Sequence, residues 1–510
     1  MRKQSFRVWA LASMTALSLA MVTTSCSDDD NSATAPDREW STDGGIVAAD
    51  NLLFEGNTIG NGDKEFVFTG KQTLTKGVYH LKGWVYIADG AELTIEPGTI
   101  IKGDKATMSS LIVERGGKLI AQGTASEPIV FTSGEAAGSR MPGDWGGVIL
   151  CGKAPNNQRE QQIEGGPRTK HGGSDANDNS GVLSYVRIEF AGYPFGVDQE
   201  INGLTLGSVG SGTKIDHVQV SYSNDDSYEW FGGTVNCKYL IAFNGWDDDF
   251  DTDNGYNGSV QYGLSVRDPR IADKSQSNGF ESDNNADGAL ASPYTTATFS
   301  NMTFVGPKAV SSSFVNDTEA GHIDGGNFFP DNGSGLGIYQ SAMQIRRASR
   351  LNCVNSIALG WPIGLILDGE RGNTQEMAEA GELNLRNIWF ADMDITGSDA
   401  NKLYEDHLVT GYDADKQPIV DASAPSFSST FFLAQSGNRV TTSAEMMLSG
   451  RSLFNGLNAD FMPQVGSPLL SAASFSGVTG NFDQVNYIGA FGTDNWLEGW
   501  TNFDPNNTNY

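Results

Sequence analysis

Short runs of apolar residues, separated by turns rich in Gly, Asn and Asp, recur along most of the chain. Residues 84–104 and 110–134 share one layout, in which an apolar strand, a Gly-containing turn and a second apolar strand precede a Gly or Pro corner. Later segments repeat this layout at 181–192, 213–233 and 236–255. Because apolar runs of this length bounded by turn residues are typical of β-strands, the pattern predicts an all-β protein.

Helical patterns are few. Only residues 374–381 and 443–450 have the composition of short helical turns. Strands that follow one another without long helices between them exclude a doubly wound α/β fold. The all-β folds that remain possible are a sandwich, a propeller and a solenoid.

The spacing of an acidic motif favours the solenoid. Segments 226–229, 248–251 and 278–281 (DSYE, DDFD and NGFE) can be laid over one another, and the first two begin 22 residues apart. The third begins 30 residues after the second, which implies an inserted loop. One coil of a β-helix takes about 22 residues, whereas a propeller blade needs about twice that length. We therefore predict a right-handed parallel β-helix over residues 46–395, with residues 396–510 as further coils and a C-terminal closing segment of the same domain.

The N-terminus has the features of a lipoprotein signal peptide. Three basic residues precede an apolar run at residues 8–22, which is too short to span a membrane. Small residues then lead directly to Cys26, as in a lipobox, although Thr23 stands where many lipoboxes have Leu. We expect residues 1–25 to be removed and Cys26 to be acylated, with palmitate among the fatty acids. The alternative is an ordinary secreted protein in which Cys26 is incidental.

The segment after Cys26 is polar and acidic. Residues 26–45 are rich in Ser, Asp and Thr, and they are expected to form a flexible tether. The acidic run at 28–30 resembles the surface-export signal of Bacteroidetes lipoproteins, and a solvated linker is the alternative. The expected location is the outer leaflet of the outer membrane, facing the exterior.

Several stretches resemble known β-helix proteins. Residues 93–104, 119–133 and 144–155 are similar to the opening coils of bacterial parallel β-helices of the pectin-lyase-like type. Residues 202–236 and 486–505 resemble a family of Bacteroidetes surface lipoproteins with this fold. The resemblance implies the fold and the location. It implies little about activity, because the members of that family are largely of unassigned function.

The charge of the chain narrows the choice of partners. The sequence has 62 Asp and Glu against 33 Lys and Arg, for a formal net charge of −29. This excess argues against nucleic acid and anionic membrane surfaces as partners, and it is compatible with divalent cations. Three widely spaced cysteines, Cys151, Cys237 and Cys353, share no metal-binding motif and are expected to be buried thiols.

The acidic motif is the main candidate for chemistry. Equivalent positions of successive coils stack at about 4.8 Å, which would align Glu229 with Asp251 and Glu281. Carboxylates at this spacing raise one another's pKa unless a cation lies among them, and oxygen ligands without His or Cys favour Ca²⁺. A solvated acidic turn, in which Asp serves turn geometry, is the alternative. The candidate metal ligands are Asp225, Asp226, Glu229, Asp247, Asp248, Asp249, Asp251, Asp253, Glu281 and Asp283.

Aromatic residues accompany the motif. Tyr228, Phe250 and Phe280 are expected to form an inward stack that fills the core. Trp230 and Trp246 lie at the turns that carry the acids, so they are candidates for stacking on a sugar ring at the surface. Packing of both Trp side chains in a half-buried position is the alternative.

Two basic residues, Arg267 and Arg270, lie close to the motif in sequence. Polysaccharide lyases with this fold combine Ca²⁺, which neutralises a uronate, with an Arg or Lys that removes the α-proton. The two arginines are therefore the candidates for a catalytic base. A salt bridge to the neighbouring acids explains them as well.

Three functions remain open from the sequence. The first is a non-catalytic, calcium-stabilised surface module that binds a glycan or a peptide, near a nutrient-uptake transporter. The second is a calcium-dependent polysaccharide lyase or another glycan-cleaving enzyme. The third is an adhesin or a structural spacer.

Overall fold

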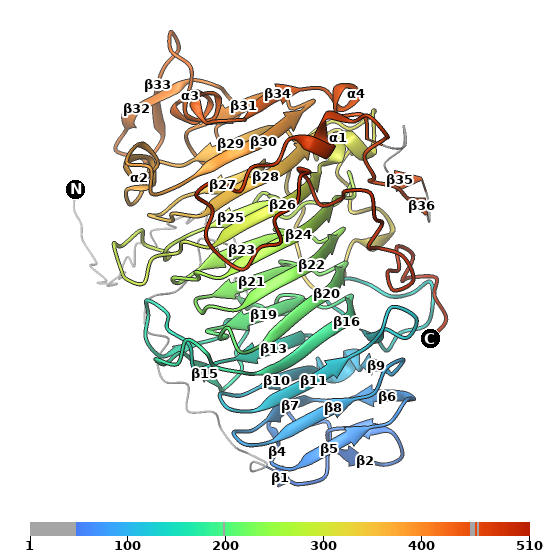
Figure 1. The fold of residues 1–510 in the computed structure, drawn as a ribbon. Coiled ribbons are helices and arrows are strands. Elements are labelled where there is room, and N and C mark those ends of the chain that lie inside the picture. Colours follow the sequence, from blue (N-terminus) through green and yellow to red (C-terminus); the bar gives the residue numbers. More distant parts are fainter. Residues whose placement is uncertain (1–46, 197–198, 449–453, 456–457) are drawn as a thin grey trace, which may run out of the picture.

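The structure is a computed structural model that describes residues 47–196, 199–448, 454–455 and 458–510. The expected signal peptide, Cys26 and the expected tether lie outside the described residues. The chain forms a parallel β-helix whose coils stack from the N-terminal to the C-terminal end, vertically in Figure 1. The predicted all-β solenoid is thereby confirmed.

Two long sheets run along the stack of coils, parallel except for the antiparallel pair β2–β3 at one end, and most coils contribute one strand to each. The first sheet contains β1 (Val47–Ala49), β4 (Phe66–Phe68), β7 (Trp84–Ile87), β10 (Ser110–Val113), β13 (Gly147–Cys151), β19 (Leu204–Gly207), β21 (Tyr228–Phe231), β23 (Phe250–Asp253), β25 (Phe280–Ser282), β27 (Ser341–Ile345), β29 (Ile363–Leu367) and β31 (Ile395–Ser398).

The second sheet is longer, because the early coils have a third face that merges with it at β16. It contains β2 (Leu53–Phe54), β3 (Thr58–Ile59), β6 (Val78–Leu81), β9 (Ile100–Gly103), β12 (Ile129–Ser133), β16 (Gly181–Glu189), β20 (Lys214–Ser221), β22 (Asn236–Phe243), β24 (Ser259–Val266), β26 (Thr298–Val305), β28 (Asn352–Leu359), β30 (Leu385–Ala391) and β34 (Arg439–Thr441). The merging strands are β5 (Lys71–Leu74), β8 (Glu92–Ile95) and β11 (Lys118–Gln122).

In the part of the chain that the structure describes, four two-stranded hairpins and several short helices lie outside the two sheets. The hairpins are β14 (Gln161–Gln162) with β15 (Lys170–His171), β17 (Pro194–Gly196) with β18 (Gln199–Glu200), β32 (Leu408–Tyr412) with β33 (Pro418–Asp421), and β35 (Phe454–Asn455) with β36 (Asn458–Ala459). The helices are α1 (Pro307–Val310), α2 (Thr374–Glu379), α3 (Phe427–Ala434) and α4 (Ser443–Met446), with 3₁₀ turns η2 (Lys105–Thr107), η3 (Gly326–Phe328) and η4 (Pro468–Ser471). The sequence predicted α2 and α4 but not α1 or α3. Within the described residues, no helix is long and apolar enough to cross a membrane.

The register of the first sheet confirms the overlay of the acidic motif. Strand β21 pairs with β23 so that Glu229 lies beside Asp251, and β23 pairs with β25 so that Asp251 lies beside Glu281. The aromatic residues one position earlier form the predicted inward stack. The ring centroids of Tyr228 and Phe250 are 5.4 Å apart, and those of Phe250 and Phe280 are 6.0 Å apart. Burial of these rings stabilises the core by about 2–3 kcal/mol each.

The core closes at the C-terminal end through α3. Phe432 of this helix stacks on Phe390 of β30, with ring centroids 4.1 Å apart. The three cysteines of the coils, Cys151, Cys237 and Cys353, are buried free thiols, as expected.

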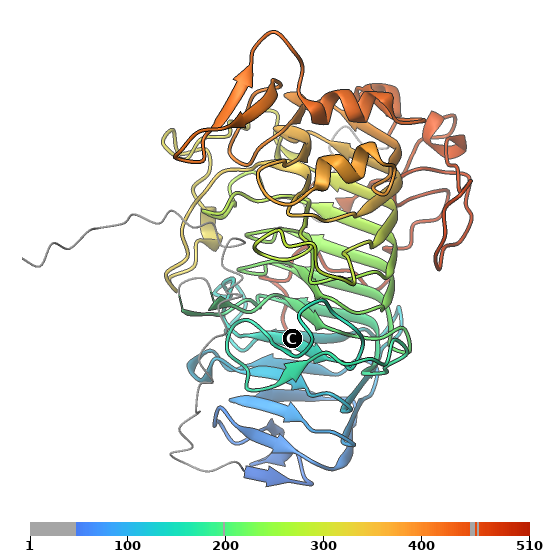
Figure 2. The same cartoon turned by 90° about the vertical axis from the view of Figure 1, so that its left-hand side faces the viewer.

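Residues 460–510 do not continue the coils but return along the outside of the second sheet, and we call this segment the strap (red in Figure 1). Asp483 N donates to Gln261 Oε1 at 2.8 Å, and Asn502 N donates to Gln219 Oε1 at 2.9 Å. The strap thus descends toward the N-terminal coils as its residue numbers rise. In Figures 1 and 2 the C-terminus lies at the level of the early coils, far from α3.

Candidate cation and ligand site

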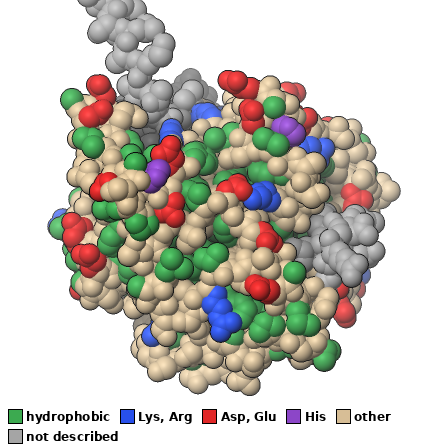
Figure 3. All heavy atoms as spheres, turned by 90° about the horizontal axis from the view of Figure 1, so that it is seen from above, with side chains coloured by type: hydrophobic (Ala, Val, Ile, Leu, Met, Phe, Trp, Pro, Cys, Tyr) green, Lys and Arg blue, Asp and Glu red, His purple; other side chains and the backbone are tan. Residues whose placement is uncertain are grey.

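The acidic residues gather where the chain turns from the second sheet into the first. The turns 222–227, 244–249 and 267–279 lie above one another at this edge, because β20, β22 and β24 are consecutive neighbours in register. We call Asp225, Asp226, Glu229, Asp247, Asp248 and Asp251 the acidic corner. At the C-terminal end, by contrast, acidic side chains are scattered among other kinds across the visible face (Figure 3).

Two groups of three carboxylates at the acidic corner are close enough to share an ion. One group is Asp225, Asp226 and Asp247, and the other is Asp226, Glu229 and Asp251. In each group the ligand atoms lie within 4.8 Å of one another, and Asp226 belongs to both. Asp226, Glu229, Asp247 and Asp251 are each at most 8% exposed.

Burial and mutual repulsion raise the pKa of these carboxyl groups. Burial is the larger cause for Asp225, Asp226, Asp247, Asp248 and Asp251, and the neighbouring carboxylates raise the pKa of each one further. A divalent cation reverses this effect, because it is the largest local charge and stabilises the ionised form.

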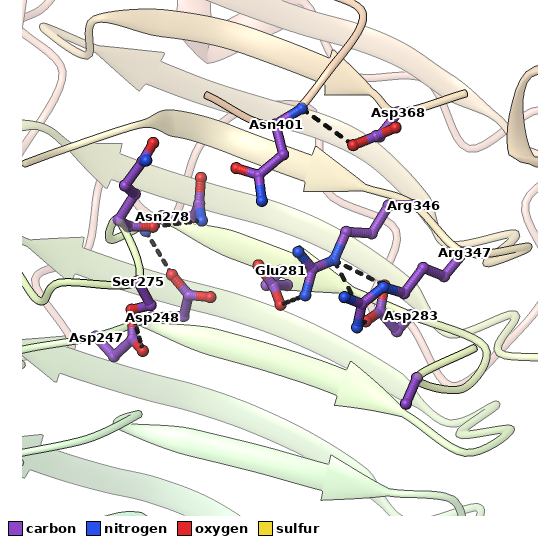
Figure 4. Close-up of polar contacts among 12 residues, drawn as sticks. Asp247, Asp248, Ser275, Asn278, Glu281, Asp283, Arg346, Arg347, Asp368 and Asn401 are labelled. Atoms are coloured by element: carbon purple, nitrogen blue, oxygen red, sulfur yellow. Dashed lines mark hydrogen bonds and ion pairs between the residues drawn. The ribbon is translucent and has the colours of Figure 1, made fainter. Parts of the chain in front are cut away.

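Hydrogen bonds from backbone N–H groups to side-chain oxygens hold the turns in register. Asp226 Oδ1 accepts a hydrogen bond from the backbone N of Asp248 at 2.8 Å. Asp248 Oδ1 accepts one from the backbone N of Asn278, and Asn278 Oδ1 accepts one from the backbone N of Ser341 at 3.0 Å. Figure 4 shows Asp248 directed toward Asn278 in this line. The line of Asp226, Asp248 and Asn278 expected from the overlay is therefore also a ladder that fixes the turns.

Several buried oxygens at the corner have no hydrogen-bond partner among the described residues. These are Asp247 Oδ1, Asp251 Oδ1 and Asn202 Oδ1, while the amide of Asn202 donates to Glu229. An unsatisfied buried polar atom costs about 1–3 kcal/mol. Anionic and amide oxygens in one place, without His or Cys, match the ligand preference of Ca²⁺. The residues present thus fit a calcium ion.

Other candidate metal ligands are engaged elsewhere. Asp249 is turned away from the corner, fully buried, and accepts hydrogen bonds from Ser265 Oγ and, at 2.8 Å, from Arg267 Nη1. Asp283 pairs with Arg346 and Arg347, which is visible in Figure 4. Because arginine charges already neutralise these two carboxylates, we do not include them in the acidic corner, and their role as metal ligands stays a prediction.

Two further acids belong to the same outward face without joining either carboxylate group. Glu281 continues the row of Glu229 and Asp251 but forms an ion pair with Arg346 (Figure 4). Asp253 accepts hydrogen bonds from the backbone and side chain of Asn254.

The expected base Arg267 is not accessible. Its side chain is completely buried, and it also donates to the carbonyl oxygen of Asp247 at 2.7 Å. Arg270 forms a bidentate pair with Asp268, with Nη2–Oδ2 and Nε–Oδ1 distances of 2.9 and 3.1 Å. Both arginines therefore have the alternative role of salt-bridge partners, and the assignment of Arg267 as a base was wrong.

The expected sugar-stacking Trp residues are also buried. Trp230 and Trp246 have no exposed surface. Trp230 packs in the core against Tyr256, with ring centroids 5.4 Å apart, and Phe329 covers Trp246 at 5.6 Å. Their assignment as surface ligand-binding residues was wrong.

A cavity of about 240 Å³ lies beside the acidic corner. Asp225 is part of its wall, together with the hairpin of β17 and β18, the turn 267–279 and the long segment that precedes β27. The lining residues are Pro194, Phe195, Gly196, Glu200, Asn224, Asp225, Asp273, Lys274, Asn332, Gly333, Ser334 and Gly335. The volume is below the roughly 300–1,000 Å³ that encloses a drug-sized ligand, so the cavity has room for a small group only.

Comparison with known proteins decides the family. A model of the pectate-lyase-like β-helix domain matches residues 67–425. The chain belongs to this family. The comparison of this sequence with curated proteins found no match. Among solved structures the chain is similar to pectate lyase Pel9A, at 12% identity and a TM-score of 0.38 over 83% of this chain and 88% of that one. It is also similar to the Dettilon tailspike protein, at 12% identity and a TM-score of 0.24 over 65% and 61% of the two chains.

Sequence reasoning missed the part of this pectate-lyase-like β-helix that forms the cavity. Lys274 and Asp273 come from the turn 267–279, and Glu200 comes from the β17–β18 hairpin. One signal was present. The step of 30 residues between the second and third motif segments indicated an inserted loop, and that loop carries Asp273 and Lys274.

Proposed function

We propose that the protein is a lipid-anchored surface module that binds a glycan through a calcium ion held at the acidic corner. The observation that carries the proposal is the double role of Asp225, which belongs to a carboxylate group and lines the cavity. An ion held there meets both the protein and the cavity, so sugar hydroxyl or carboxylate oxygens complete its coordination. Ca²⁺ accepts six to eight oxygen ligands, more than three carboxylates supply as single donors.

The net charge explains why the ion is needed. A chain of charge −29 repels acidic glycans and offers little attraction to neutral ones. A bound divalent cation creates a local positive centre in this negative field. Phe195 and Pro194 add an apolar wall to the cavity, which suits one face of a sugar ring.

The glycan test uses an array of neutral and uronate-containing oligosaccharides, probed with the chain from residue 47 in Ca²⁺ and in chelator. Binding in Ca²⁺ that disappears in chelator is expected. Asp225→Asn should lose at least tenfold in affinity, whereas Asp287→Asn, at an exposed turn, should bind as the wild type does. Glycan binding that is equal in chelator, or no binding to any glycan, would refute the proposal.

The anchor is tested separately. In cells, Cys26→Ser should move the protein from the membrane fraction to the soluble fraction and abolish labelling by a fatty-acid analogue such as a palmitate probe. The proposed location is the exterior of the cell, next to a nutrient-uptake transporter. Protease added to intact cells should then degrade the wild-type protein. Protection from the protease would place it in the periplasm.

A calcium-dependent lyase is the second candidate, because Lys274 lines the same cavity as Asp225. A neutral lysine could accept the α-proton of a uronate whose carboxylate is bound to the ion. Incubation with polyuronates should then increase the ultraviolet absorbance of unsaturated product ends, and Lys274→Met should abolish it. Glycan binding without any cleavage product would favour the non-catalytic module. The absence of both glycan binding and product would favour an adhesin or a spacer.

A further inference from the structure

Asp226 is shared by the two carboxylate groups of the acidic corner. From this geometry we infer that the corner holds two divalent cations, bridged by the Asp226 carboxylate, one facing the cavity and one enclosed on the first sheet. The inference deepens the cation part of the proposed function and rests on it, but it requires no glycan. We call the two positions the cavity position and the sheet position.

The cavity position is formed by Asp225, Asp226 and Asp247. Asp247 uses one carboxylate oxygen to accept a hydrogen bond from Ser275 Oγ at 2.7 Å, and its Oδ1 is buried without a partner. Asp225 forms part of the cavity wall. An ion at this position has an open side, where a ligand can exchange.

The sheet position is formed by Asp226, Glu229 and Asp251. Glu229 and Asp251 are neighbours in register on β21 and β23, and Asp251 Oδ1 is buried without a partner. None of these three residues lines the cavity. An ion at this position is enclosed by protein and serves to hold successive coils together.

Neutral side chains give an observation that is independent of the acids. Asn202 is 2% exposed, its amide donates to Glu229, and its Oδ1 has no partner. Thr205 is 1% exposed, lies beside Glu229 in register, and its Oγ1 has no partner. Neutral oxygens left unsatisfied around a carboxylate group match the mixed oxygen ligands that Ca²⁺ takes in proteins.

Charge balance favours two ions over one. The two groups together contain five carboxylates, which carry five negative charges when ionised. One divalent ion leaves three of these charges in a buried site, whereas two ions leave one. Asp226 can bridge because a carboxylate has four lone-pair positions, and the hydrogen bond from Asp248 N occupies only one of them. Bridged ions in two-metal sites lie about 3.5–4 Å apart.

The experiment measures Ca²⁺ stoichiometry on the chain from residue 47 after removal of ions with chelator, by native mass spectrometry and equilibrium dialysis without glycan. The wild type should bind two ions. Asp225→Asn and Glu229→Gln should each bind one, and Glu229→Gln should lose more of the thermal stabilisation by Ca²⁺. Asp226→Asn keeps the acceptor for Asp248 N and should weaken both ions at least tenfold.

Asp287→Asn is the matched control and should bind two ions. A wild type that binds one ion, or an Asp226→Asn variant that still binds one ion with unchanged affinity, would overturn the inference. If circular dichroism shows that Asp226→Asn does not fold, the stoichiometries of Asp225→Asn and Glu229→Gln still test whether the corner holds two ions. Two ions without glycan binding would refute the glycan-binding function alone, and one ion with calcium-dependent glycan binding would refute the bridged pair alone.

Discussion

At the scale of single residues, the protein buries many charged and polar groups, and it handles them in two ways. Some are neutralised within the protein, as Asp249 is by Arg267, with both side chains completely buried. Others, at the acidic corner, have neighbours of the same sign and unsatisfied oxygens. A buried charge without a partner is costly, so the first kind is structural and the second kind points to a cation.

Arg267→Met should destabilise the protein by about 3–5 kcal/mol, because it leaves Asp249 as a buried and unpaired carboxylate. Adding Asp249→Asn should recover part of this loss, since the double variant contains no uncompensated charge. Urea unfolding followed by Trp fluorescence measures both effects. A double variant that is less stable than Arg267→Met would show that the charge of Asp249 is not the cause.

His171 should make the stability depend on pH. Its ring is buried, Nδ1 lies 2.8 Å from Ser208 Oγ, and burial, with a smaller effect of Arg115, lowers its pKa to about 3. Between the pKa of an unfolded histidine, about 6.5, and this value, only the unfolded chain takes up the proton. Stability is therefore lost as the pH falls below about 6.5, by about 2 kcal/mol at pH 5.

The measurement compares urea midpoints at pH 7 and pH 5 for the wild type and His171→Gln. The difference between the two midpoints should be smaller in the variant, because Gln takes up no proton. An identical pH effect in both proteins would assign it to other groups.

At the scale of elements, the long strands of the second sheet each bend at one residue with a positive φ. The β-pairing is interrupted at these residues, but the pairs on either side of each bend keep the same register, so the bend residues of neighbouring strands lie opposite one another. They are Tyr185, His217, Tyr239, Tyr262, Asn301, Asn355 and Asn387, with φ between 50° and 64°. Neighbouring rings stack, for instance His217 on Tyr239 with centroids 4.3 Å apart, and the asparagines bond to the strap. These contacts therefore join the bends to the strap.

Asn355 offers a test of the backbone strain at a bend. It has φ 53°, and its Oδ1 accepts hydrogen bonds from Ser474 N at 2.8 Å and from Asn387 Nδ2 at 3.1 Å. Asn355→Ala and Asn355→Gly both remove these bonds, but only Gly adopts the left-handed conformation without strain. Asn355→Gly should therefore be about 1 kcal/mol more stable than Asn355→Ala in thermal unfolding. Equal stability would mean that the strand relaxes at the bend.

The sequence predicts the elements better than it predicts the site. The motif segments repeat the same residue types, and the first two are one coil length apart, so their alignment in register could be predicted despite the loop before the third. The burial of Trp230 could also have been foreseen, because it lies two positions after the inward Tyr228 and strands alternate sides. The burial of Trp246 could not, since Phe329 covers it from a long segment whose path no periodicity describes. The same limit hid the cavity residues, which come from loops distant in sequence.

At the scale of the whole molecule, the strap changes how stability is distributed along the solenoid. In a simple solenoid each coil contacts only its neighbours, so the ends open independently of the middle. Here the C-terminal residues contact early coils. Tyr510 OH donates to Glu189 Oε1 at 2.6 Å, and Lys102 Nζ donates to Tyr510 O at 2.9 Å. Tyr510 thus contacts coil residues about 320 and 410 residues earlier in the sequence, so the strap couples the early coils to the C-terminal end of the chain.

Arg140 is the residue at which this coupling can be released. It is 2% exposed, its Nη1 donates to Thr508 O at 2.9 Å, and its guanidinium carbon lies 4.9 Å from the ring centroid of Tyr510. Arg140→Met keeps much of the apolar packing of the side chain but removes these polar contacts. Amide hydrogen exchange in peptides from residues 501–510 should become at least tenfold faster, while peptides from β22 and β24 keep their protection. Arg371→Met replaces an exposed arginine that donates to the carbonyl oxygen of Ala286, and it should change neither set of peptides. Faster exchange throughout the coils would show instead that the strap is an integral part of the core and that the solenoid does not fold without it.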